Sequence, residues 1–84
     1  STKVLAVSTA EILYQISSGA RAFEAGNLGI TNIFYGGSNL PANSGLYIAS
    51  NGGAKFWDTV TDNFQMYFRC STVGQLIIQE YAGN

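Results

Sequence analysis

The chain has 84 residues, enough for one small domain with a single thin core. Only 11% of its residues are charged, whereas 46% are hydrophobic and 13% aromatic, and the net charge is −1. This apolar composition argues against disorder, and four scattered basic residues argue against a nucleic-acid interface. The single cysteine excludes an intrachain disulfide, and no apolar run approaches the ~20 residues of a membrane-spanning helix.

Alternation of apolar and polar residues with a period of two recurs along the chain, and turn-forming Gly, Asn and Ser interrupt it. In chain order the predicted strands cover residues 4–7, 11–16, 21–25, 31–35, 46–49, 55–59, 64–70 and 75–81. A helix over residues 9–16 is the second choice for that stretch. The pattern predicts an all-β protein, a small β-sandwich or barrel of seven to eight short, mainly antiparallel strands.

Residues 1–84 are expected to form one domain, with residues 1–8 either as a first strand or as an extended N-terminal arm. The longest loop, residues 38–45, holds the only proline, Pro41, and is expected to cross between sheets. In the strand at 64–70, the side chains of Phe64, Met66, Phe68 and Cys70 share one face, which is expected to be the buried one.

The residues offer little for catalysis. The chain has no histidine, which removes the commonest general base and zinc ligand. Asp58 and Asp62 are read as solvated turn residues, and the sequence around them lacks the spacing of a calcium loop. Gly36 and Gly37 follow a strand but precede no helix, so a turn is favoured over a phosphate site. We expect no enzyme, no cofactor and no catalytic or metal-binding residues.

Outward-facing aromatic side chains are the features most easily connected with binding. If Phe56 faces the core, Trp57 points outward, and Tyr67 is turned away from the apolar face of its strand. Such rings stack on sugars or anchor protein interfaces. The chain also has few of the lysines and prolines that keep sheet edges from pairing, so partner subunits are expected to cover its edges.

A resemblance to a known group of proteins is carried by residues 27–38, 45–49 and 75–80. Asn-Leu-Gly at 27–29 is followed by Thr-Asn-Ile-Phe-Tyr-Gly-Gly-Ser at 31–38, then by Gly-Leu-Tyr-Ile-Ala at 45–49 and an apolar strand at 75–80. This arrangement resembles small all-β virion proteins of tailed phages, which carry an Asn-Leu-Gly-x-x-Asn-Ile-Tyr-x-Gly-Gly-like segment. The resemblance implies a bacteriophage virion structural protein, and it implies no catalytic residues.

Within that group, a capsid decoration or cement protein that stabilises the head by binding between capsid subunits is favoured. The alternatives are a head–tail or tail component, or a small carbohydrate-binding module that uses Trp57 and Tyr67. The expected partners are the major capsid protein or another virion protein and further copies of the chain, without nucleic acid or membrane. The expected location is the capsid surface, after synthesis in the host cytoplasm. The predicted interface residues are Trp57, Tyr35, Tyr47, Tyr67, Val4, Leu5, Leu40 and Pro41.

Overall fold

The computed structural model describes residues 1–41 and 44–82, and within them eight strands and no helix. The strands are β1 (Thr2–Val7), β2 (Ile12–Gln15), β3 (Ala20–Asn27), β4 (Ile33–Gly36), β5 (Tyr47–Ile48), β6 (Gly53–Trp57), β7 (Gln65–Arg69) and β8 (Gly74–Ala82). All strand pairs are antiparallel. The predicted all-β class is therefore confirmed, and the stretch at 9–16 contains a strand rather than a helix.

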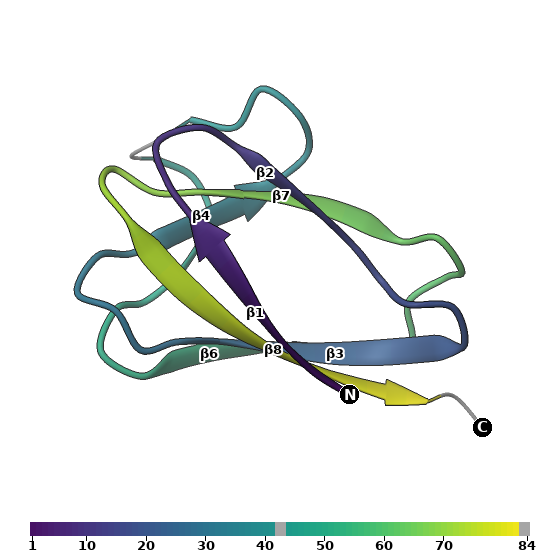
Figure 1. Ribbon diagram of the computed structural model, residues 1–84. Coiled ribbons are helices and arrows are strands. Elements are labelled where there is room, and N and C mark those ends of the chain that lie inside the picture. The colour runs from purple at the N-terminus through teal and green to yellow at the C-terminus, as the bar shows by residue number, and fades with distance from the viewer. Residues whose placement is uncertain (42–43, 83–84) are drawn as a thin grey trace.

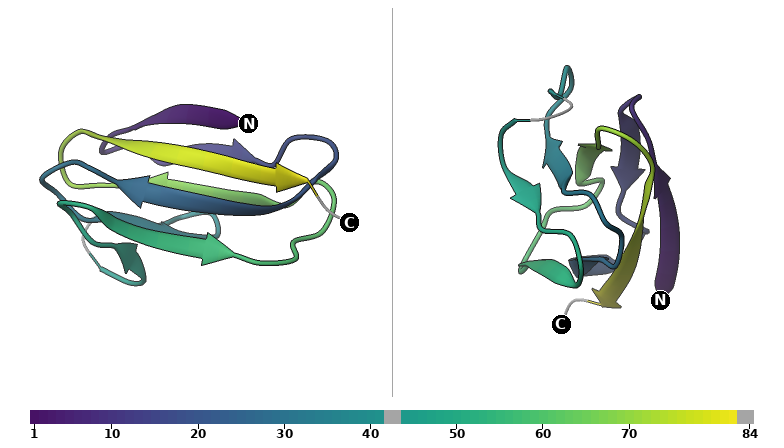
Figure 2. Two further views of the ribbon diagram at one scale, coloured as in Figure 1. Left: turned by 90° about the horizontal axis from the view of Figure 1, so that it is seen from below. Right: turned by 90° about the vertical axis from the view of Figure 1, so that its left-hand side faces the viewer.

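Two four-stranded sheets face each other and share one core (Figures 1 and 2). Sheet A has the order β1-β8-β3-β6, and sheet B has the order β2-β7-β4-β5. The left panel of Figure 2 shows sheet A from purple β1, at one edge, to teal β6 at the other. Residues 2–7 pair with β8 along their whole length, so the N-terminal segment is an edge strand of sheet A.

The core lies between the sheets and is rich in aromatic rings. Phe23 is fully buried; its ring stacks on Trp57 at 4.7 Å and contacts Tyr14 at 5.0 Å. On β7, Met66 and Phe68 face this core. The predicted inward face of residues 64–70 is confirmed, because Cys70 is also buried and Phe64 packs against the cluster.

The orientation expected for β6 is wrong. Phe23 lies directly opposite Trp57, and Glu24 lies opposite Phe56. Residues that lie opposite each other project to the same face of a sheet, so Trp57 points toward the core with Phe23, while Phe56 is exposed with Glu24. Both side chains are large and apolar, and the alternation of a short edge strand gave no sign of which one is buried.

The loop at 38–45 does not cross between sheets. It joins β4 to β5, which are neighbours in sheet B. The other six connections each carry the chain from one sheet to the other. Residues 42–43 of this loop lie outside the described part of the chain. The expected crossing is therefore wrong. The length of this loop and its proline do not mark a connection between the two sheets, because shorter loops make all six of those connections.

Candidate interaction surface

The Asn-Leu-Gly segment is held in place by the buried side chain of Asn27, at the end of β3. Its Nδ2 donates hydrogen bonds to the carbonyl oxygens of Thr31, at 2.8 Å, and Ile48, at 3.1 Å. Its Oδ1 accepts a hydrogen bond from the Gly29 amide at 3.0 Å. A buried amide with its donors and acceptor in use fixes the backbone around it. The β3–β4 loop is thereby tied both to itself and to β5.

The loop between β5 and β6 also holds the Asn-Leu-Gly segment in place. The Asn51 amide donates to the Gly29 carbonyl, and the Gly52 amide donates to the Asn27 carbonyl, each at 2.8 Å. Asn51 and Gly52 both have positive φ, of 60° and 103°, which is the conformation that Asn-Gly pairs adopt most readily. At Gly53 a Cβ atom would lie 2.3 Å from the Ala49 carbonyl oxygen, so only glycine fits there. These glycines serve backbone packing.

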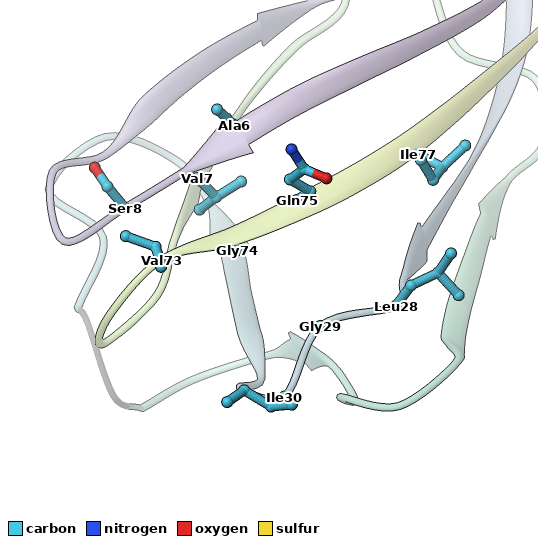
Figure 3. A pocket seen from close by; sticks show the side chains of 10 residues that line it. All are labelled: Ala6, Val7, Ser8, Leu28, Gly29, Ile30, Val73, Gly74, Gln75 and Ile77. Carbon is cyan, nitrogen blue, oxygen red and sulfur yellow. The ribbon is translucent and has the colours of Figure 1, made fainter.

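This rigid loop displays large apolar side chains to solvent. Leu28 is 73% exposed and Ile30 is 85% exposed, and Val73, in the β7–β8 loop, is 75% exposed. Between them is a groove of about 680 Å³, lined by ten residues from the end of β1, the loop after β3 and the start of β8, none of them charged. In Figure 3, Leu28 and Ile30 lie on one side of the groove, and Val73 and the end of β1 lie on the other. We call Leu28, Ile30, Val73 and this groove the end surface.

The apolar character continues from the end surface across the outer face of sheet A. Val4 on β1 lies opposite the half-buried Ile77 on β8, and both project outward. Farther along the face the exposed rings of Phe56 and Tyr81 contact each other at 6.0 Å. Glu24 is the one charged side chain at the described outward positions of the four strands. A sheet face with so little charge is unusual for a surface that remains in water.

Glu80 is the buried charge of the described structure, and it attaches β1 to the sandwich. Its carboxylate accepts hydrogen bonds from the Tyr14 hydroxyl at 2.5 Å, the Ser17 amide at 3.1 Å and the Ser1 hydroxyl at 3.2 Å. Lys3 Nζ lies 3.5 Å from the same carboxylate. Lys3 therefore projects from the inner face of β1, and its side chain remains 43% exposed there.

The environment of Glu80 keeps its carboxylate ionised. Burial alone would raise the pKa of Glu80, but the hydrogen bonds from Tyr14 and Ser17, together with the charge of Lys3, outweigh it and lower that pKa to about 2. The pKa of Tyr14 is raised, by burial first and then by its hydrogen bond to the Glu80 carboxylate and the charge there. Tyr14 therefore remains a donor at all physiological pH values. The role of these groups is structural, since each already has a partner within the fold. We call the Glu80 carboxylate and the groups bound to it, from Ser1, Lys3, Tyr14 and Ser17, the clasp.

The remaining carboxylates do not gather into a site. Asp62 forms an ion pair with Arg21 at 2.5 Å, and Asp58 accepts a hydrogen bond from the Thr59 hydroxyl at 3.3 Å. Glu11 accepts from the amide of Leu40 at 2.9 Å. Over residues 1–41 and 44–82, no group of three or more His, Cys, Asp or Glu side chains is arranged to hold a metal ion.

The residues predicted for an interface are spread over the molecule. Val4 and Tyr47 are exposed, as is Pro41, whereas Leu40 is buried. Leu5 packs partly against the core. Tyr35 is half-buried and meets Trp57 edge to face at 5.2 Å. Tyr67 is half-buried on sheet B, so it does not form a common platform with Trp57 of sheet A. Of the predicted residues, only Val4 and Leu5 belong to a strand that borders the end surface.

Leu28, Ile30 and Val73 were not among the predicted interface residues. Their signal in the sequence is weak, because an apolar residue beside Gly or Thr reads equally well as the end of a strand. The usable clue was the Asn-Leu-Gly segment itself. Once Asn27 is known to point inward, Leu28 must point outward.

No family model, curated protein or solved structure matches this chain. Its described residues contain no helix of the length and apolarity needed to cross a bilayer.

Proposed function

We propose that the protein is a structural component of a bacteriophage virion, a capsid decoration protein that stabilises the head by binding between capsid subunits. The observation that carries the proposal is the end surface, where Leu28 and Ile30, on a loop fixed by Asn27, and Val73, on the β7–β8 loop, are each more than two-thirds exposed. The resemblance of residues 27–38 and 45–49 to phage virion proteins supports a location on the virion.

The end surface suits a tight contact with another protein. Burying three such aliphatic side chains contributes about 5 kcal/mol in total, at roughly 1.5–2 kcal/mol for each. Since the hydrogen bonds of Asn27 already order the loop, little conformational entropy remains to be lost on docking. A single contact of this strength gives weak binding, but a decoration protein acts through many copies on one shell.

The proposal is tested with empty capsids of the phage that encodes the protein, assembled without it. Added protein is expected to cosediment with these shells and to raise their melting temperature. Leu28→Asp and Ile30→Asp should each weaken binding by about 10- to 100-fold, because each variant places a charge where an aliphatic side chain is to be buried.

The matched control is Leu13→Asp, which places the same charge at an exposed leucine on sheet B. It should leave binding to the shells unchanged. Failure of the unaltered protein to bind the shells, or equal losses with Leu13→Asp and Leu28→Asp, would overturn the proposal. Binding to purified tails in place of heads would move the protein to the head–tail or tail class.

A further inference from the structure

The edge strand β1 carries a row of backbone groups with no partner inside the sandwich. Ser1 and Glu80 exchange both of their backbone hydrogen bonds, at 3.0 and 2.8 Å. In an antiparallel ladder the residues of one strand point their N–H and C=O groups alternately toward and away from the neighbour. Lys3, Leu5 and Val7 therefore bond to β8, and the groups of Thr2, Val4 and Ala6 point out of the open edge.

This open edge has few of the features that discourage strand pairing. It contains no proline, and its register with β8 runs through all six residues without a bulge. Its one charged side chain, Lys3, is of the kind that protects sheet edges, but its charge is paired with Glu80 on the inner face. A regular edge whose single charge is paired within its own subunit leaves its backbone groups open to another strand. The other sandwich edges are shorter: β2 has four residues, β5 two and β6 five.

The three outward-bonding residues are complementary to themselves. When two β1 strands run antiparallel about a two-fold axis at Val4, Val4 lies opposite the partner's Val4, and Thr2 lies opposite the partner's Ala6. All three residues then exchange both hydrogen bonds with the partner, for six in total. Shifting the register by two residues leaves only two of the three paired.

The side chains of β1 are compatible with this antiparallel pairing of two copies. Lys3 lies opposite the partner's Leu5, so like charges do not face each other. Val4 of each copy forms a β-branched cross-strand pair on the outer face, where Ile77 already lies beside it. The outer faces of the two copies, each with Glu24 as its one charged side chain at the described outward positions, become one continuous surface.

We infer that two copies of this chain pair through β1 to form an eight-stranded sheet with a two-fold axis at Val4. The contact is one strand long, so it buries less than the roughly 800 Å² per partner of a stable interface. The dimer is therefore expected to be weak and to dissociate on dilution. The inference does not depend on what the end surface binds.

Sedimentation velocity between about 10 µM and 1 mM is expected to show a 9.0 kDa monomer that converts to a species of twice that mass. Val4→Pro removes one of the outward amides without breaking a bond to β8, and it should raise the dissociation constant at least tenfold. The matched control is Leu13→Pro, on the edge strand of the other sheet, which should leave dimerisation intact. Absence of a dimer at 1 mM, or equal effects of the two prolines, would refute the inference.

Cysteine crosslinking tests the register without requiring a proline to be tolerated. Opposite residues in a hydrogen-bonded antiparallel pair have Cα atoms about 5.5 Å apart, and their Cβ atoms lie farther apart than the roughly 3.5–4.5 Å of an unstrained disulfide, so a short bifunctional thiol reagent is used in place of direct oxidation. With this reagent Val4→Cys should form a crosslinked dimer, and Thr2→Cys alone should not. A mixture of Thr2→Cys and Ala6→Cys proteins should crosslink to each other. The native Cys70 is fully buried and does not compete. Crosslinking of Thr2→Cys to itself at the rate of Val4→Cys would rule out the proposed register.

Discussion

Replacing Asn27 with alanine tests whether the end-surface loop is held by one side chain. The substitution removes the hydrogen bonds to the carbonyls of Thr31 and Ile48 and from the Gly29 amide. Each bond contributes about 1 kcal/mol net, so the three together contribute about 3 kcal/mol. We expect the free energy of unfolding to fall by about 3 kcal/mol. A chain of this length is stable by only about 4–13 kcal/mol, so the loss is a large fraction of the whole.

Urea unfolding followed by tryptophan fluorescence measures this change. Trp57 is the only tryptophan and stacks on the buried Phe23, so its emission reports on the core. A matched control is Asn32→Ala, which loses a single exposed hydrogen bond from the Ser50 amide and should cost less than about 1 kcal/mol. If Asn27→Ala loses no more than this control, the loop is held by its neighbours and the reasoning is wrong.

Two further substitutions test the clasp and the loop backbone. Because its folded-state pKa of about 2 lies below the ordinary 4.5, Glu80 contributes stability that is fully present above pH 4.5 and is lost as the pH falls toward 2. The loss is about 3 kcal/mol. Glu80→Gln should lower stability at pH 7 and flatten this pH dependence in urea titrations, whereas the exposed Glu24→Gln should not; parallel curves for the two variants would contradict the clasp. Gly53→Ala places a methyl group against the Ala49 carbonyl, and it should cost 2 kcal/mol or more or prevent folding. A melting temperature within about 3 °C of that of the unaltered protein would contradict this prediction, because it would show that the backbone around Ala49 shifts to make room for the methyl group.

Local patterns in the sequence carried most of the strand assignment. The strand at 64–70 alternates cleanly between apolar and polar residues, so its inward face followed directly. For β6 both neighbours, Phe56 and Trp57, are aromatic, so alternation alone had no preference. The inward position of Trp57 is decided by its pairing with Phe23 across the sheet, a contact that joins residues far apart in the chain.

The end surface was harder to predict than the strands. Leu28 and Ile30 come from one loop and Val73 from another, with four strands between the two loops in the sequence, and only the completed fold brings them to one groove. Their exposure depends on Asn27 pointing inward, which is a tertiary property of a polar residue in an apolar core. The resemblance to phage proteins rests on residues 27–38, a segment that includes Leu28 and Ile30, but it does not indicate which side chains the segment presents.

The strand order of sheet A has a consequence for how the chain reaches this structure. β8 is the last strand in the sequence, yet it lies between β1 and β3 and hydrogen-bonds to both. Until residues 74–82 have been synthesised, β1 has no neighbouring strand in its sheet. Its backbone hydrogen-bonding groups and apolar side chains are then left without their partners in the fold. Non-local pairing of this kind slows folding, so the nascent polypeptide is most vulnerable to aggregation in the interval just before β8 inserts between β1 and β3.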